Sequence, residues 1–144
     1  MRKVIFTMLL LGLMKPAFAL GVNEWNLAKP QLDKCEALQS KQHNLCLADE
    51  YRVVDLKLNN LYKKLYSALA DPKLLQKSQK DWLKFRDSHC EFSIGTVAGY
   101  EHSYALNACL IDLTEKRILD IQSVWVCNGC PEFKPEIYTS GKWQ

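Results

Sequence analysis

Two stretches of helical periodicity, joined at Asp71-Pro72, constrain the fold of this chain more than any other feature. In the first stretch, apolar residues recur every three or four positions for about six turns. They are Leu47, Tyr51, Val54, Leu58, Leu61, Leu65 and Leu69. Pro72 interrupts the pattern, because proline suits the first turn of a helix and disfavours helical geometry in the residue before it. The same spacing then continues through Leu75, Gln79, Trp82, Phe85, Arg86 and His89. Residues 44–92 therefore predict a helical hairpin.

A third amphipathic helix is predicted from about Glu101 or His102 to Val124. Residues 93–100 separate it from the hairpin, because their two glycines break the helical pattern. Its apolar residues form two adjoining stripes, which are Leu106, Leu110 and Leu113, and Tyr104, Ala108, Ile111, Ile118, Ile121 and Trp125. Residues 131–144 show no helical repeat. We therefore expect a small all-α bundle of three main helices, with a short leading helix and an irregular C-terminal tail.

The first 19 residues have the organisation of a secretory signal. Met1-Arg2-Lys3 is basic, residues 4–14 are almost entirely apolar, and Ala17-Phe18-Ala19 supplies small residues for signal peptidase. The apolar core is too short to span a bilayer, and no cysteine lies at the cleavage site to carry a lipid. We predict an exported protein without a membrane anchor after cleavage, with a linker at 20–33, a helical domain at 34–126 and a tail at 127–144.

Cleavage of this signal would remove the chain's surplus of positive charge. The chain has 19 Lys and Arg against 16 Asp and Glu, and residues 1–19 hold three of the basic residues and no acidic one. The mature chain would therefore have 16 of each. Nucleic-acid-binding proteins need a basic surplus on one face. The lysines at 63–64, 77, 80 and 84 fit solvent-facing helix positions, so we predict no nucleic-acid partner.

Six cysteines in an exported chain favour a disulfide framework, although six cysteines allow 15 pairings. On one straight helix Cys35 and Cys46 would lie roughly 16 Å apart, whereas a disulfide needs Cα atoms within about 7 Å. If they pair, the chain must turn between them. The polar residues 39–44 suit such a turn, with Asn44 capping the long helix and Cys35 on a short leading helix that folds back.

Cys90 and Cys109 come within reach of one another if the third helix packs against the second, so pairing in sequence order needs the least reorganisation. Cys127 and Cys130 could then form a structural disulfide, a redox dithiol or a zinc knuckle. A redox pair usually begins a helix in a βαβ setting, whereas this pair follows a helix. A zinc knuckle needs a second cysteine pair at metal-site spacing. We favour the structural disulfide and predict no metal and no cofactor.

Charged residues on the inward stripes predict a polar cluster inside the bundle. Asp55 lies beside Val54 and Leu58, and buried charges are normally paired. Arg86 is its natural counterpart, and Arg117 is another candidate. We expect a structural role for this cluster, whose predicted members are Asp55, Asn59, Trp82, Arg86, Asp87 and Arg117. His89 is expected to pack on the same inner stripe. No phosphate loop, dinucleotide fingerprint or nucleophile elbow is present in the sequence, so no enzyme activity is predicted.

A series of cysteine and polar positions follows a recognisable order. These positions are Asn44-x-Cys46, Tyr51, Asp55, Leu58-Asn59, Tyr62 and Leu65, then Gln79-x-x-Trp82-x-x-Phe85-Arg86-Asp87-x-x-Cys90, and finally Cys109, Leu113-Thr114 and Arg117. Over residues 35–121 they resemble the LprI-type lysozyme inhibitor domain of small exported bacterial proteins, many of them uncharacterised. The resemblance implies a disulfide-tied helical domain in which the first two cysteines are bridged and the next two are bridged.

The chain also departs from the pattern of that family. The turn before the fourth cysteine often contains Gly-Gly-Ser in the family, whereas residues 94–99 here read Ile-Gly-Thr-Val-Ala-Gly. The lipid-anchored member that gives the family its name has a lipobox cysteine, which this chain lacks. The Cys127/Cys130 extension lies outside the shared region.

The resemblance implies a periplasmic or secreted bacterial protein, a non-catalytic binding protein that protects the cell wall by occupying a lysozyme. Residues 94–103, with Tyr100, Glu101 and His102, are the predicted contact surface, and the alternative is that this segment only connects two helices. A second hypothesis is a periplasmic protein-interaction or toxin-neutralising module of unknown partner, with the tail aromatics Phe133, Tyr138 and Trp143 as contacts. A third is an envelope thiol–disulfide protein that uses Cys127 and Cys130.

Overall fold

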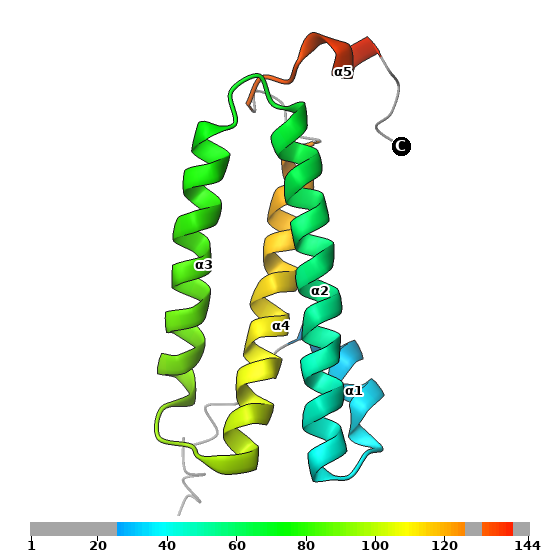
Figure 1. Ribbon diagram of the computed structural model, residues 1–144, viewed down its shortest axis with the longest axis vertical. Helices are drawn as coiled ribbons and strands as arrows, with labels where there is room; N and C mark the ends of the chain where they lie inside the picture. Colours follow the sequence, from blue (N-terminus) through cyan, green and yellow to red (C-terminus); the bar gives the residue numbers. More distant parts are fainter. Residues whose placement is uncertain (1–25, 126–130, 140–144) are drawn as a thin grey trace, which may run out of the picture.

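The computed structural model describes residues 26–125 and 131–139 of the chain, and this part is all-α (Figure 1). Its helices are α1 (Lys29–Glu36), α2 (Ser40–Ala68), α3 (Lys73–Ile94), α4 (Gly99–Val124) and α5 (Pro135–Thr139). The three long helices and the short leading helix confirm the predicted bundle. The described residues contain no helix long and apolar enough to cross a membrane.

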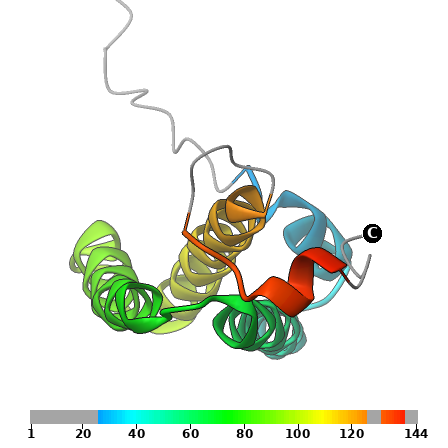
Figure 2. The ribbon, with the colours of Figure 1, turned by 90° about the horizontal axis from the view of Figure 1, so that it is seen from above.

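The core lies mainly between α2 and α4. Seen from above, α2, α3 and α4 occupy the corners of a triangle (Figure 2). α2 packs most extensively on α4, α3 packs on α4, and α1 packs on α2. The predicted stripes of α2 and α4 supply the largest buried side chains, which are Leu47, Leu58, Leu65, Ile111, Ile118 and Ile121. Each such side chain contributes about 1.5–3 kcal/mol when it leaves water, so this pair of helices holds the bundle together.

The inward face of α3 differs from the prediction. Phe85 is 51% exposed and His89 is also exposed, whereas the buried residues of α3 are Gln79, Arg86, Cys90 and Ile94. A helix turns through about 100° per residue, so neighbours such as Phe85 and Arg86 cannot both face the core. The prediction that Phe85 and His89 point inward is wrong, because Arg86 takes that direction.

Two predicted helix starts also differ. α2 begins at Ser40, so the polar residues 39–44 are not the turn, and Asn44 lies within the helix instead of capping it. α4 begins at Gly99, two residues before the predicted start. Gly95 and Gly99 flank the connection between α3 and α4 with φ of 61° and 67°. Glycine adopts this region without the steric cost that other residues incur, which fixes the sharp reversal here.

Both disulfides expected from the resemblance are present. Cys35–Cys46 joins α1 to α2 with a Cα–Cα distance of 5.8 Å, and Cys90–Cys109 joins α3 to α4 at 5.7 Å. α1 therefore folds back on α2, as predicted, although it begins at Lys29, within the segment predicted as a linker. Cys127 and Cys130 lie outside the described residues.

The described part of the tail returns to the end of α2. An isolated bridge pairs Leu69 with Phe133, and the Phe133 ring stacks on Trp125 with the ring centroids 5.1 Å apart. The short helix α5 follows, which the sequence did not predict. Phe133 is therefore partly buried rather than a free contact residue, while Trp143 and the side chain of Tyr138 are outside the described part.

Candidate functional site

The predicted polar cluster centres on Arg86 of α3. Its side chain is 8% exposed. Nη1 lies 3.3 Å from Asp55 Oδ1 on α2, and Nε donates to Asp87 Oδ1 at 2.9 Å. The guanidinium also lies over the rings of Tyr51 and Trp82, at 5.6 and 5.2 Å from their centroids. Two carboxylates and two aromatic rings thus compensate one buried cation.

The rest of the cluster extends this arrangement towards α2. Asn59 Nδ2 donates to Asp55 Oδ2 at 2.8 Å, which occupies the second carboxylate oxygen. Burial raises the pKa of Tyr51, and the positive charge of Arg86 partly offsets this rise. Because α3 packs mainly on α4, the contact from Arg86 to Asp55 is a side-chain link between α3 and α2.

Arg117 of α4 does not pair with Asp55. Its Nε donates to Gln79 Oε1 at 3.1 Å, and its Nη2 donates to Ser78 Oγ at 2.9 Å. The guanidinium lies 5.7 Å from the centroid of the Trp82 ring. Within the described residues no carboxylate oxygen lies within 4.0 Å of it. Burial lowers the pKa of Arg117, with Asp120 acting in the opposite sense.

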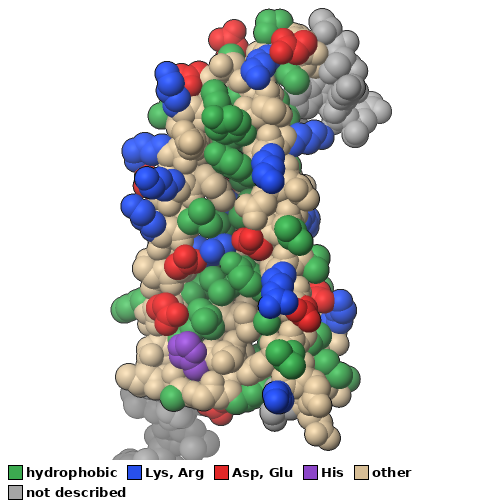
Figure 3. Space-filling model, viewed as in Figure 1, with side chains coloured by type: hydrophobic (Ala, Val, Ile, Leu, Met, Phe, Trp, Pro, Cys, Tyr) green, Lys and Arg blue, Asp and Glu red, His purple; other side chains and the backbone are tan. Residues whose placement is uncertain are grey.

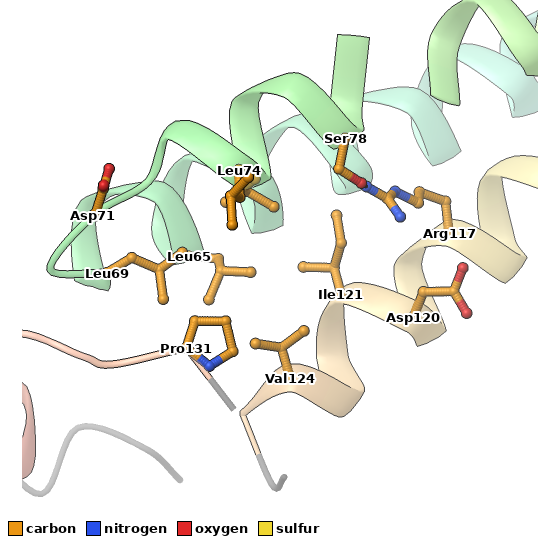
Figure 4. Close-up of a pocket in the computed structure, with 11 residues that line it drawn as sticks. Leu65, Leu69, Asp71, Leu74, Ser78, Arg117, Asp120, Ile121, Val124 and Pro131 are labelled. Carbon is orange, nitrogen blue, oxygen red and sulfur yellow. The ribbon is translucent and has the colours of Figure 1, made fainter. Parts of the chain in front are cut away.

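A pocket of about 220 Å³ opens beside Arg117, between α2, α3 and α4 (Figure 4). Its lining is mostly apolar and includes Leu65, Leu69, Leu74, Leu75, Ile121, Val124 and Pro131. Ser78, Asp71, Asp120 and Arg117 supply the polar groups. Asp71 Oδ1 accepts the backbone N–H of Lys73, the first residue of α3, at 3.1 Å. The pocket was not predicted, because its walls come from three separate helices.

The three predicted contact residues lie in the first turn of α4, after the connection from α3, but point in different directions. The Tyr100 hydroxyl lies 3.1 Å from His43 Nδ1, and Asn44 Nδ2 donates to the Tyr100 carbonyl at 3.1 Å. His102 Nε2 instead faces Glu91 Oε2 of α3 at 3.7 Å. Glu101 is exposed and forms no ion pair within the described residues. Tyr100 thus contacts α2, while the side chain of His102 faces α3.

This end of the bundle has two further features that were not predicted. Residues 95–101 are all exposed, Phe92 is 85% exposed and Val97 is 41% exposed. Residues 87–115 also contain no Lys or Arg but five acidic residues, which are Asp87, Glu91, Glu101, Asp112 and Glu115. The lysines of α3, by contrast, lie between its start and its middle, at 73, 77, 80 and 84, where basic side chains gather in Figure 3. Counting charged residues by segment would have revealed this uneven distribution of charge. The exposure of Phe92, by contrast, cannot be predicted from the sequence.

Residues 35–121 match the family described as Lysozyme inhibitor LprI, a range that contains both disulfides, the Arg86 cluster and the turn from α3 into α4. The chain belongs to the LprI lysozyme-inhibitor family. It is 27% identical over 120 residues to the uncharacterized protein R02472 of Rhizobium meliloti strain 1021, covering 69% of this chain and 83% of that protein. It is 30% identical over 114 residues to the uncharacterized protein YecT of Escherichia coli strain K12, covering 67% and 68%. No solved structure matches the chain.

Family membership supports a non-catalytic, inhibitor-like role. The two disulfides fit a location outside the cytoplasm, where such bonds persist. Within the described residues no group of three His, Cys, Asp or Glu is placed to hold a metal ion.

Proposed function

We propose that this protein is an exported inhibitor that binds a lysozyme through the turn between α3 and α4 and thereby protects peptidoglycan. The observation that carries the proposal is the match of residues 35–121 to the Lysozyme inhibitor LprI family. An inhibitor of this kind needs no catalytic group of its own. It needs a rigid projection that fills the substrate cleft of the enzyme.

The turn between α3 and α4 suits that task, since it forms one end of the bundle (Figure 1). Phe92, Val97 and Tyr100 offer exposed apolar surface, and buried aromatic side chains commonly dominate binding energy. Glu91 and Glu101 offer carboxylates to a cationic rim. The Cys90–Cys109 disulfide ties α3 to α4 behind the turn. A preorganised surface loses less conformational entropy on binding.

The direct test is the lysis of a cell-wall suspension by c-type, g-type and bacterial lysozymes, with and without the oxidised mature protein, residues 20–144. We expect dose-dependent inhibition of one class. Phe92→Ala and Tyr100→Ala should each weaken inhibition at least about tenfold, as expected for truncated aromatic hot spots. Phe85→Ala is the matched control, because Phe85 is an exposed phenylalanine on the same helix about two turns from Phe92.

Two results would count against the proposal. If the oxidised protein inhibits no class of lysozyme, the inhibitory function itself is rejected. If it inhibits but Phe92→Ala and Tyr100→Ala behave like Phe85→Ala, the inhibitory function stands and the contact surface lies elsewhere.

A further inference from the structure

We propose that the pocket between α2, α3 and α4 binds a small amphipathic carboxylate, with its apolar chain inside the pocket and its carboxylate on Arg117. This site lies at the end of the bundle opposite the turn between α3 and α4, so it is separate from the proposed lysozyme contact.

The apolar part of the site is built from three helices and the start of the tail. In Figure 4 the side chains of Leu65, Leu69, Ile121, Val124 and Pro131 surround a common space. Leu74, at the rim, is 81% exposed, so an apolar ligand would cover a large hydrophobic side chain that now meets water. A cavity of about 150 Å³ holds a benzene ring, so a pocket of about 220 Å³ admits a chain of roughly eight carbons.

Arg117 supplies the positive charge that would pair with the carboxylate of the ligand. Both of its side-chain partners, Gln79 and Ser78, are neutral acceptors, and Gln79 is itself buried with 7% exposure. They hold the guanidinium in place without neutralising it, and its Nη1 has no partner within the described residues. Asp120, three residues further along α4, attracts the guanidinium but forms no ion pair with it within the described residues. A partly buried cation normally has an anionic partner, and a guanidinium accepts a carboxylate through two parallel hydrogen bonds.

The other charges at the rim restrict the kind of anion. Asp71 and Asp120 line the same pocket, and Asp71 already accepts the backbone N–H of Lys73. Two nearby carboxylates penalise a dianionic head group more than a singly charged one. The site therefore favours a monocarboxylate over a phosphate monoester of the same chain length.

The test titrates octanoate into the oxidised mature protein and detects binding by the NMR shifts of the protein's methyl groups. We expect saturable binding in a 1:1 ratio, with the shifts centred on Leu65, Ile121 and Val124. 1-Octanol should bind at least tenfold more weakly, because it cannot pair with Arg117, and octyl phosphate should also bind more weakly. Hexanoate should lose about three- to fourfold for each methylene removed from the buried chain.

Substitutions separate the charge from the pocket. Arg117→Gln should weaken octanoate binding at least tenfold while leaving 1-octanol binding unchanged, which also shows that the pocket is still folded. Arg117→Lys should retain part of the affinity. Lys80→Gln removes an exposed lysine from α3 outside the pocket lining and should have no effect. The proposal is overturned if octanoate shows no saturable binding. This outcome includes the case in which side chains of the protein itself occupy the pocket and exclude the ligand. It is also overturned if octanoate and 1-octanol bind equally.

Discussion

At the scale of single residues, two arginines on neighbouring helices meet different surroundings. Arg86 lies between two carboxylates, whereas Arg117 is held by an amide and a hydroxyl. Both were predicted as partners of Asp55. The sequence could not separate them, because each lies at a helical position within reach of the inner stripe, and only the packing of α3 on α4 places Gln79 beside Arg117.

Replacing Arg86 should destabilise the protein substantially. Arg86→Met keeps much of the apolar length but leaves Asp55, whose side chain is 33% exposed, without its cation. Loss of one partner of a fully buried pair costs about 3–5 kcal/mol, and partial exposure reduces this to about 2 kcal/mol in the free energy of unfolding. Urea denaturation measures the change. Arg52→Met removes an arginine that is 75% exposed in its pair with Asp49, and should cost less than about 0.5 kcal/mol. Equal losses in the two variants would contradict this view of the cluster.

Tyr51 should make stability sensitive to alkaline pH. Burial raises its pKa above the ordinary value of 10.0, so the folded state holds the phenolic proton more tightly than the unfolded state does. This contribution to stability is complete below the unfolded pKa and decreases as the pH rises through about 10. The wild type should therefore lose more stability than Tyr51→Phe between about pH 8 and about pH 11. Parallel losses in urea titrations of the two proteins would refute the assignment.

At the scale of the helices, α3 is the most weakly held of the three long helices. Its buried side chains include Gln79 and Arg86, so it contributes less apolar surface than α2 or α4. Its covalent link to the bundle is the Cys90–Cys109 disulfide, which closes a segment of 19 residues. A bridge of about this span is worth about 3 kcal/mol on the loop-entropy estimate.

Removing this disulfide should therefore release α3 before the rest of the bundle. In Cys90→Ala/Cys109→Ala, amide hydrogen exchange should accelerate throughout α3, while α2 and the second half of α4 keep most of their protection. Cys35→Ala/Cys46→Ala is the matched control, because it frees α1 and should leave the exchange of α3 unchanged. Uniform acceleration in all helices of the first variant would show instead that the bundle opens as one unit.

The difference between α2 and α3 also explains how far the sequence predicts the fold. α2 carries apolar residues at regular spacing, and Leu47, Leu58 and Leu65 are indeed buried. The inner face of α3 is partly polar, so an apolar pattern pointed to Phe85, which is exposed. The candidate sites depend on such exceptions. Phe92 is exposed although it is apolar, and this does not follow from residue type or spacing. The inward position of Arg117 was predicted, but its partners Gln79 and Ser78 were not, because they lie on another helix.

At the scale of the whole molecule, acidic and basic residues are distributed unevenly along α3 and α4. The acidic residues of segment 87–115 include Glu91 and Glu101 at the turn between α3 and α4, whereas the lysines of α3 lie towards its start (Figure 3). The predicted mature chain has equal numbers of acidic and basic residues, but their uneven distribution produces a dipole along α3. Such a dipole turns the acidic end towards a cationic partner during encounter.

This separation predicts how salt affects the binding of the lysozyme that the protein inhibits, provided that this enzyme is cationic. Raising the salt concentration from about 50 mM to about 500 mM shortens the screening length from about 14 Å to about 4 Å. The association rate constant should fall at least about tenfold, because steering depends on charges that act before contact, whereas the dissociation rate constant should change less than about threefold.

Glu91→Gln/Glu101→Gln should lose most of this salt dependence. Lys73→Gln/Lys80→Gln removes the same number of charges from the opposite end and should retain it. Stopped-flow measurements of the three proteins decide the matter, and an association rate with the same salt dependence in all three would show that the acidic end does not guide the encounter.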